Sequence, residues 1–304
     1  MIRPDITAKM IASSMSLDGV RIDTMQLRYP RIIHAEFMTH RMFSRNASSS
    51  RAIPTTSLLA RDEDIFIPDF RYNKPGMQPG GHLCSDDQAE AARIWKQMAD
   101  TVINGCKTLA AKDGLNVHKQ YANRPLEWFG YIDVLVTTTN WANWDHLRDH
   151  DAAQDEIAIL ARAIKKERKR VKPMVLDERE WHLPYITPED RTLAIQYADD
   201  FKSDIRKIFS KTVMFEVSRP EALLLIASAA RCCRVSYSKH DGTKSNFAED
   251  IERFKKLMPD NGPMHATPLE HQASPIPRDS DGLCGNFTGW EQFRKMFDNE
   301  ALTE

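Results

Sequence analysis

The sequence lacks the short glycine-containing motifs that identify the commonest nucleotide-binding enzymes and hydrolases. It has no P-loop and no G-x-G-x-x-G, so the phosphate-binding turns of ordinary ATPases and of dinucleotide-binding folds are both missing. It also has no G-x-S-x-G, which excludes the nucleophile elbow of the serine hydrolases. No internal repeat or low-complexity tract occurs. Any nucleotide chemistry must therefore use another kind of site.

Cysteine is scarce and shows no pairing pattern. The five cysteines are odd in number and include no C-x-x-C, which argues against a disulfide framework and against a zinc ribbon. Neither Cys232 nor Cys233 is followed by the signature of an activated thiol, so we expect both to be small core residues. The chain suits a reducing compartment, and we expect it to be cytoplasmic. The cysteines are Cys84, Cys106, Cys232, Cys233 and Cys284.

No charge of one sign prevails, and no long hydrophobic run occurs. Lys plus Arg number 42 against 43 for Asp plus Glu, a net charge of -1, so any positive field must be local. The longest apolar run, residues 222–230, is about half of what a membrane span requires. The N-terminus does not resemble a secretory signal. We expect no membrane partner.

A run of cations at residues 165–170 ends a helix that we expect over 152–170. Cations in the last turn of a helix favour the macrodipole, so the run is interpreted as a solvated helix end. The alternative is a nucleic-acid patch, which would need interleaved aromatic residues or a recognisable module. Neither is present, and a nucleic-acid partner is not expected.

The 304 residues are enough for one large domain or two small ones, and we expect a single domain over 1–304. A turn at Asp18 and Gly19 leads to a strand over 20–29, and a second strand is expected over 131–139. The stretch 66–81, rich in proline and glycine, is a loop and a candidate flap over a site. Helices are expected over 32–38, 85–112 with Ser85 as its N-cap, 152–170, 188–210 after the cap Thr187, 220–230 and 247–257.

Residues 40–51 form the most unusual segment. They contain three arginines, four serines, a histidine and an asparagine, and no acidic residue. Such a segment repels itself unless an anion lies against it. Arginine and serine together are the usual donors for a phosphate. Apolar residues lead into the segment and follow it, which favours an anion-binding site over the alternative of a solvated basic loop.

A second cluster contains His265, Glu270 and His271. Its spacing differs from that of a zincin helix, where two histidines lie four residues apart, and Pro268 interrupts any helix here. We expect no metal site. The expected structure is a turn capped by Thr267, with Glu270 three residues further on.

The pattern His40-Arg41-x-x-Ser44-x-Asn46-x-x-Ser49-x-Arg51 resembles the R-H-R-x-x-S-x-N-E-x-S-x-R-Y signature of the flavin-dependent thymidylate synthases. The segment 29–33 is similar to the proline-containing strand that precedes the motif in that family. Two further segments agree. Residues 143–148 with 153–157 are similar to the family's N-F-x-x-L-R and A-Q-x-E-I, and residues 123–126 lie where it carries another nucleotide-contacting arginine.

The third matching block comes from the end of the chain. Residues 234–237 and 265–271 resemble the family's A-R-V-S-Y and H-x-T-P-F-E-H motifs, which usually precede the arginine motif. The order here implies a circular permutation, with residues 158–228 as a helical insertion. Permutation is tolerated when the old termini are close together at the surface. The resemblance implies an α+β fold, in which helices flank a curved antiparallel sheet and an added helical region is present. It also implies a homotetramer.

The resemblance implies a site for FAD and a pyrimidine deoxynucleotide monophosphate. The chemistry would transfer a one-carbon unit from methylenetetrahydrofolate to C5 of dUMP, giving dTMP, with NADPH as the source of hydride and no enzymic cysteine nucleophile. Ser49, Arg51 and Arg148 would be the catalytic residues. The cofactor-binding residues would be His40, Arg41, Asn143, Ser236, His265, Thr267 and Glu270. The nucleotide-binding residues would be Glu36, Ser49, Ser50, Arg51, Arg124 and Arg148.

Four positions depart from the family pattern: Glu36 for glutamine, Thr39 for arginine, Ala47 for glutamate and Ala52 for tyrosine. These changes leave open dCMP as substrate or a hydroxymethyl product, since a site that hydrogen-bonds an exocyclic group discriminates strongly against analogues. The alternative from another class is a nucleotide- or nucleic-acid-binding protein that has lost catalysis.

Overall fold

The computed structural model describes residues 5–55, 58, 64–210, 217–236, 246–259, 265–276 and 284–297. Its centre is a five-stranded sheet in the order β3-β4-β2-β1-β5. Four strands are antiparallel neighbours, and β5 runs parallel to β1. The expected α+β class is confirmed, while the parallel edge strand differs from the expected antiparallel sheet. The strands are β1 (Thr7–Ser16), β2 (Arg21–Pro30), β3 (Ser44–Ala47), β4 (Tyr131–Thr138) and β5 (Met174–Leu176).

The expected turn at Asp18 and Gly19 joins β1 to β2. The Gly19 amide donates to the Ser16 carbonyl at 2.9 Å, and Gly19 has φ of 81°. A positive φ is easy only for a residue without Cβ, so glycine suits this position. The strands expected over 20–29 and 131–139 are confirmed within one residue at each end, whereas β1, β3 and β5 of the same sheet are additional.

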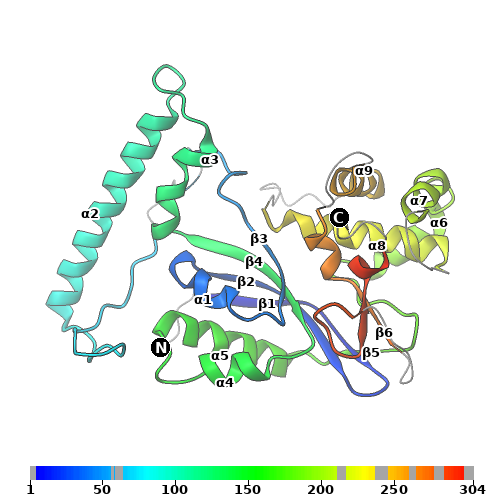
Figure 1. Ribbon diagram of the computed structural model, residues 1–304, viewed down its shortest axis with the longest axis horizontal. Helices are drawn as coiled ribbons and strands as arrows, with labels where there is room; N and C mark the ends of the chain where they lie inside the picture. The colour runs from blue at the N-terminus through cyan, green and yellow to red at the C-terminus, as the bar shows by residue number, and fades with distance from the viewer. Residues whose placement is uncertain are drawn as a thin grey trace, which may run out of the picture.

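Two helices cover one face of the sheet, α4 (Ala142–Arg148) and α5 (Asp155–Arg170) (Figure 1). α5 begins three residues later than expected. Leu160 and Ile164 of α5 are fully buried against Met25 and Val134 in one apolar core. Alternate side chains of β2 and β4 point to this core, which is why those strands contain so many large apolar residues.

A chain of buried hydrogen bonds crosses the sheet through polar side chains. Ser14 Oγ lies 2.9 Å from His182 Nδ1, and His182 Nε2 lies 2.8 Å from Thr24 Oγ1. Thr24 and Thr137 hydroxyls are 2.6 Å apart, and Thr137 Oγ1 lies 2.7 Å from His271 Nδ1. All five residues are at most 2% exposed. The bonds satisfy polar groups that would otherwise be costly to bury.

An arm extends from β4 and stands away from the sheet at the left of Figure 1. Its long helix α2 (Ser85–Ala110) packs through Ala99, Ile103 and Cys106 on a small core. Cys84 occupies the N-cap, so Ser85 is the first helical residue and not the cap. The arm also contains α3 (Lys119–Ala122) and η4 (Arg124–Phe129).

The remaining helices form a second layer beside the sheet, around the buried α8 (Arg219–Cys232). The apolar run 222–230 is the core of this helix. The helix expected over 188–210 is in fact two, because the chain turns at Ala198 and restarts after Phe201. The cap expected at Thr187 is confirmed, and it forms a capping box with Asp190. The helices are α6 (Pro188–Tyr197), α7 (Lys202–Phe209) and α9 (Phe247–Leu257), with η5 (Cys233–Ser236), η6 (Thr267–Glu270) and η7 (Phe293–Met296).

A two-stranded sheet of β6 (Ala273–Pro275) and β7 (Trp290–Gln292) joins this layer to the central sheet. None of the helices in the described part of the chain has the length and apolar character needed to cross a bilayer.

Candidate functional site

Residues 40–51 form a tight corner that leads into the edge strand β3. Before it lie η1 (Arg31–Ile33) and α1 (His34–Met38), the helix expected over 32–38. The Thr39 amide donates to the Glu36 carbonyl at 3.2 Å, and the Phe43 amide donates to the His40 carbonyl at 3.3 Å. Residues 44–47 of the segment form β3. The strand fixes their backbone and places alternate side chains on opposite faces.

His40 and Arg148 meet, although they lie 108 residues apart in the chain. Arg148 Nε donates to His40 Nε2 at 3.0 Å. The imidazole is 5% exposed, and its ring lies 4.9 Å from Trp144 and 5.6 Å from Phe43 between ring centroids. These aromatic contacts orient the imidazole, so two of the sequence motifs converge on one point.

The His40 imidazole is held neutral. Burial, together with the smaller effects of the Arg148 and Arg45 charges, lowers its pKa from 6.5 to about 4. A neutral ring that accepts at Nε2 carries its proton on Nδ1. Arg148 Nη2 lies 3.4 Å from Thr39 Oγ1, while its Nη1 has no partner in the described part of the chain. One edge of the Arg148 guanidinium is thus available to a ligand.

Glu36 adds an unpaired acceptor to this corner. Its Oε2 is buried and has no hydrogen-bond partner among the described residues, and its backbone carbonyl lies 3.5 Å from Arg148 Nη2. A buried carboxylate oxygen without a donor is costly, and a ligand N–H or O–H would satisfy it.

The predicted nucleotide residues Ser50 and Arg124 meet at a residue that the sequence analysis missed. The Glu127 carboxylate accepts from the Ser50 hydroxyl and from Arg124 Nη1 at 3.0 Å, and it pairs with Arg31 at 3.0 Å. The guanidinium of Arg124 is therefore already paired with a carboxylate, which it shares with Arg31. The three-residue spacing of Arg124 and Glu127 on one helical turn was the available signal.

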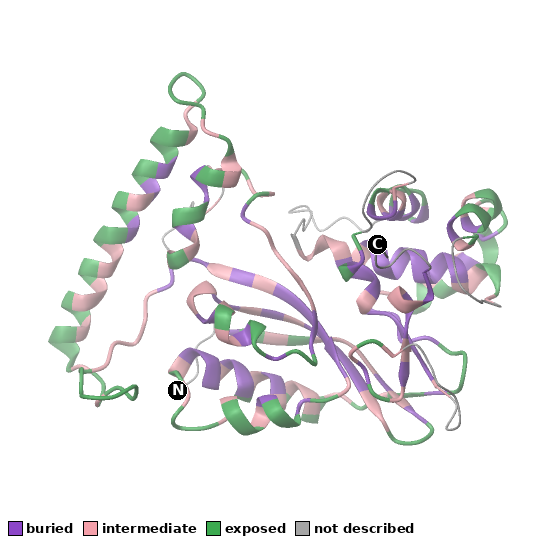
Figure 2. Cartoon of the chain, viewed as in Figure 1, coloured by how far each residue is buried: buried purple, intermediate pink, exposed green. Residues whose placement is uncertain are grey.

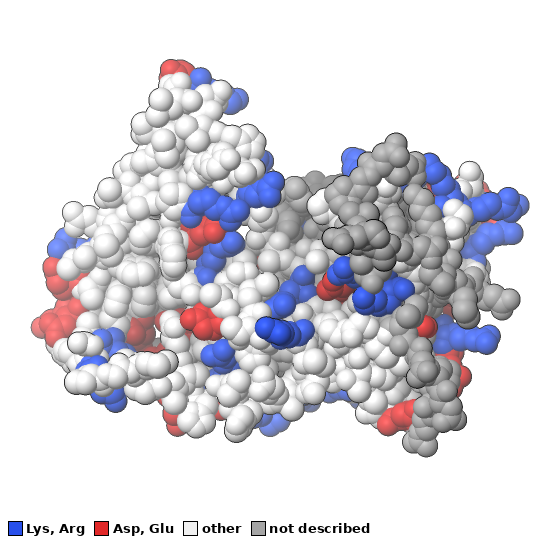
Figure 3. Space-filling model, viewed as in Figure 1, with Lys and Arg blue, Asp and Glu red and all other residues white. Residues whose placement is uncertain are grey.

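Arg51 and Ser49, unlike Ser50 and Arg124, contact no carboxylate among the described residues. Arg51 is exposed, and neither its guanidinium nor the Ser49 hydroxyl has a partner in the described part of the chain. Figure 3 shows Lys and Arg side chains along the middle of the face that lies between the arm and the helices of the second layer. The Arg51 guanidinium and the Ser49 hydroxyl together fit a phosphate group.

Ser44 and Asn46, on one face of β3, bind residues from later parts of the chain. Ser44 Oγ donates to Asn286 Oδ1 at 3.0 Å and accepts from Gln292 Nε2 at 3.2 Å. Asn46 Nδ2 donates to the Cys232 carbonyl at 2.7 Å. These motif residues therefore position β3 against the second layer.

Other late-chain residues also reach β3, because η5 and η6 both contact this strand. Arg45 Nη1 donates to the Met38 carbonyl at 2.8 Å. Burial lowers the pKa of Arg45, while the neighbouring charges of Tyr29 and Glu270 raise it. Glu270 forms an ion pair with Arg294. The cap predicted at Thr267 is wrong, because Ala266 is the N-cap of η6 and its side chain cannot cap the helix.

The other predicted cofactor residues provide free donors. Arg41, Asn143, His265 and Thr267 are exposed, and their side chains have no partner among the described residues. The side chain of Ser236 lies outside the described residues. A guanidinium, an amide, an imidazole and a hydroxyl fit the phosphates and hydroxyls of a dinucleotide such as FAD. No group of ligands for a metal occurs in the described part of the chain.

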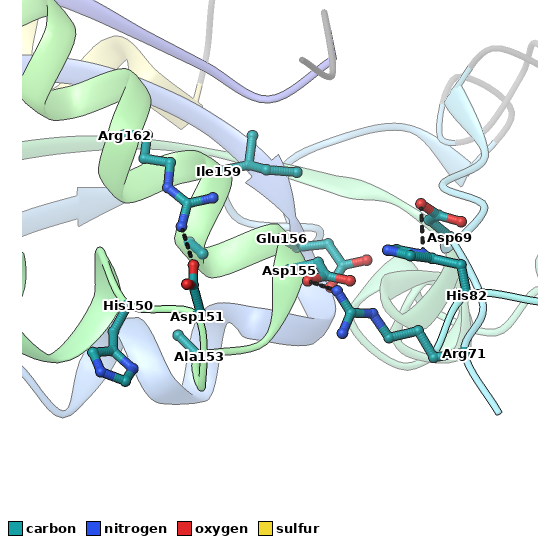
Figure 4. Close-up of a pocket in the computed structure, with 11 residues that line it drawn as sticks. Asp69, Arg71, His82, His150, Asp151, Ala153, Asp155, Glu156, Ile159 and Arg162 are labelled. Carbon is teal, nitrogen blue, oxygen red and sulfur yellow. Dashed lines mark hydrogen bonds and ion pairs between the residues drawn. The ribbon is translucent and has the colours of Figure 1, made fainter. Parts of the chain in front are cut away.

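A separate polar cavity of about 350 Å³ lies between the loop expected over 66–81 and the start of α5 (Figure 4). Arg71 of the loop pairs with Asp155 at 2.6 Å, and His82 lies 3.2 Å from Asp69. The loop therefore forms one wall of this cavity, while its role as a flap over the predicted site stays a prediction. None of the predicted site residues lines this cavity.

The basic run 165–170 borders a shallow hollow of about 510 Å³. Three of its five cations form ion pairs, among them Arg170 with Glu167. Lys165 pairs with Asp149 at 2.7 Å, and Arg168 pairs with Asp145 at 2.7 Å. These pairs favour the solvated helix end over the nucleic-acid patch.

No protein-family model matches the chain, and no curated protein matches it in sequence. Among solved structures, the chain is similar to the UMP/dUMP methylase PolB from Streptomyces cacaoi, bound with 5-Br UMP and with 5-Br dUMP. The TM-scores are 0.45 and 0.46, each at 19% identity. The likeness covers 56% of this chain and 91% or 92% of PolB. Similarity at this level does not show a shared family.

Proposed function

We propose that the protein transfers a one-carbon unit from methylenetetrahydrofolate to C5 of a pyrimidine deoxynucleotide monophosphate, converting dUMP to dTMP with FAD. The observation that carries the proposal is the 3.0 Å contact between His40 and Arg148. It joins the two sequence blocks that separately resemble the flavin-dependent thymidylate synthases. Such a contact is expected if both blocks form one site.

The nucleotide is assigned to the donors that are still free. Arg51 and Ser49 hold its phosphate, because a guanidinium and a hydroxyl together match a phosphate's acceptors. Arg148, fixed by His40 through Nε, directs Nη1 to the nucleotide and stabilises negative charge that develops on the base. The Glu36 carboxylate accepts a hydrogen bond from the base.

FAD is assigned to Arg41, Asn143, His265 and Thr267, with His40, Ser236 and Glu270 nearby. When bound and reduced by NADPH, the flavin supplies the hydride that brings the transferred carbon to the methyl level. This chain contributes orientation and charge. Its buried thiol Cys232 is not used, and burial raises the pKa of that thiol well above its ordinary value.

A permuted motif order is part of the proposal. It requires the late motifs to return to residues 40–51, and the contacts of η5 and η6 with β3 agree with that. The insertion over 158–228 and the homotetramer stay predictions. Residues 158–170 belong to α5, which packs on the central sheet, so any insertion would start within a core helix.

The test is to purify the protein, measure flavin absorbance, and assay tritium release from C5 of labelled dUMP with methylenetetrahydrofolate and NADPH. We expect a yellow protein, and we expect tritium release to depend on FAD, methylenetetrahydrofolate and NADPH. A colourless protein that does not take up FAD would contradict the proposal. Nucleotide binding without NADPH oxidation would support the non-catalytic alternative.

The second candidate substrate is dCMP, favoured by the unpaired Glu36 Oε2. A carboxylate accepts well from the amino group of cytosine, which uracil lacks. Parallel tritium-release assays on dUMP and dCMP separate the two, with Glu36→Gln as the variant. If Glu36 selects cytosine, the variant should lower the ratio of dCMP to dUMP activity about tenfold or more. An unchanged ratio would remove this candidate.

A further inference from the structure

The segment 153–157 has no role in the proposed flavin and nucleotide site. Three of its residues, Ala153, Asp155 and Glu156, line the polar cavity of about 350 Å³ (Figure 4). In the described part of the chain, no residue assigned to the nucleotide or to FAD lines this cavity. The cavity therefore needs an explanation of its own.

The loop that forms one wall of the cavity has a defined shape, although its tip is exposed at the lower left of Figure 2. The Gly80 amide donates to the Tyr72 carbonyl at 2.8 Å. A Cβ on Gly80 would lie 2.9 Å from the same oxygen, so this close approach requires glycine. Gln78 Nε2 donates to the Ala152 carbonyl at 2.9 Å, which adds a second attachment to the Arg71 ion pair. The folded chain alone thus builds this cavity.

Carboxylates outnumber guanidiniums in the lining of the cavity. Both guanidiniums are already paired, Arg71 with Asp155 at 2.6 Å and Arg162 with Asp151 at 3.2 Å. An anion would therefore find no uncompensated arginine. When the two histidines of the lining are neutral, two negative charges are left over, so the cavity suits a cation. The carboxylates are those of Asp69, Asp151, Asp155 and Glu156.

One of the uncompensated charges is buried at Glu156. This residue is 4% exposed, and its Oε2 accepts from Gln154 Nε2 at 2.9 Å. The other oxygen, Oε1, has no partner among the described residues, although the side chain lines the cavity. In Figure 4 the Glu156 carboxylate points toward the part of the cavity that Asp69 and His82 border. A buried carboxylate oxygen without a donor is costly, so a donor in the cavity would stabilise it.

The lining favours an organic cation over a metal ion. No group of three or more histidine, cysteine or acidic side chains in the described part of the chain is placed to hold a metal. An ammonium group brings three N–H donors, and the apolar part of the lining gives methylene groups a surface to pack on. At about 30 Å³ for each non-hydrogen atom, the volume of a water molecule in the liquid, the cavity holds roughly ten such atoms. The apolar lining residues are Ala153, Ala158 and Ile159.

We propose that this cavity binds a linear aliphatic amine, with a primary ammonium group on Glu156 and the methylene chain along Ala153 and Ile159. The ammonium group donates to Glu156 Oε1, and Asp69 adds a second negative charge on the loop side. Because Asp69 belongs to the loop and Glu156 to α5, the bound amine joins the two walls of the cavity. The proposal is independent of the proposed function, since the cavity shares no residue with the flavin and nucleotide site.

The test is isothermal titration of the full chain, without nucleotide or flavin, with spermidine and with a neutral alkanediol of the same chain length. We expect spermidine to bind at one saturable site and the diol not to bind. Glu156→Gln keeps an acceptor for Gln154 and removes the charge, so it should raise the Kd for spermidine at least about tenfold, as expected for a lost charge-assisted hydrogen bond. The matched control is Glu178→Gln, at an exposed position without a partner among the described residues, which should bind like the wild type.

A second variant tests where the amine binds. Ala153→Leu places a larger side chain in the apolar part of the cavity, so it should also raise the Kd at least about tenfold, while circular dichroism shows that the variant is folded. Spermidine should raise the thermal midpoint of the wild type, and at concentrations below the variant's Kd it should leave that of Glu156→Gln nearly unchanged. The proposal is overturned if spermidine does not bind saturably, if the diol binds equally well, or if either cavity variant binds like the wild type.

Discussion

Two arginines that look alike in the sequence have different surroundings in the folded chain. Arg51 is exposed and has no partner among the residues that the structure describes, whereas Arg124 is bound to the Glu127 carboxylate at 3.0 Å. A guanidinium that already neutralises a carboxylate has less to offer a phosphate. The two residues should therefore contribute unequally to nucleotide binding.

Arg51→Ala should weaken nucleotide binding by about 1.5–3 kcal/mol, the value of a charge-assisted hydrogen bond. Arg124→Ala is the matched control and should cost less than about 1 kcal/mol, because its charge is already paired. Isothermal titration with dUMP measures both. Equal losses for the two variants would place Arg124 in direct contact with the nucleotide.

The sequence predicts the site residues that belong to a motif, but it does not predict which residues they contact. The two blocks containing His40 and Arg148 each predict a site residue, and the fold brings these two together. Glu127 was missed because its role depends on Arg31 and Ser50, which approach it only after folding. The free or occupied state of an arginine is a tertiary property.

At the scale of elements, α8 and α9 are held by one buried carboxylate. Asp250 on α9 is fully buried; its Oδ2 accepts from Arg231 Nε at 2.9 Å, and Arg234 and Arg253 lie 3.9 and 3.7 Å away. Three guanidiniums around one carboxylate repel each other once the carboxylate is removed. The carboxylate therefore stabilises the contact between the two helices.

Asp250→Ala should lower the free energy of unfolding by about 3–5 kcal/mol, as expected when one partner of a buried ion pair is removed. Urea denaturation followed by circular dichroism measures the change. Glu252→Ala on the same helix is the control, and its surface pair with Lys255 should contribute less than about 1 kcal/mol. Similar losses for both variants would contradict a special role for the buried carboxylate.

Elements with a strong pattern are predictable here, and elements made by tertiary contact are not. α9 and β4 combine clear periodicity with distinct ends, and both are found where expected. β1 is missed because small and polar residues such as Ser13 and Ser14 occupy it, and Ser14 is buried only through its bond to His182. The break between α6 and α7 arises because Ala198 and Phe201 both pack on the same core.

For the whole molecule, the buried histidines link stability to pH. Burial lowers the pKa of His182 and of His271 from 6.5 to about 3, with the charge of His182 adding to the effect on His271. The unfolded chain therefore binds protons more tightly than the folded chain below pH 6.5. The stability from these neutral rings is complete above pH 6.5 and is lost progressively as the pH falls toward 3.

Between pH 6.5 and 5 the free energy of unfolding should fall as the pH is lowered, by up to about 1.4 kcal/mol per pH unit for each such histidine. His182→Gln should reduce this slope by about one histidine's share, even though the variant is less stable at pH 7 because its bonds to Ser14 and Thr24 are altered. His146→Gln, at an exposed position on α4, should leave the slope unchanged. Urea titrations at a series of pH values give the slopes. A His182→Gln slope equal to that of the wild type would mean that the folded chain does not hold this imidazole neutral, and the hydrogen bonds across the sheet would then need another arrangement of protons.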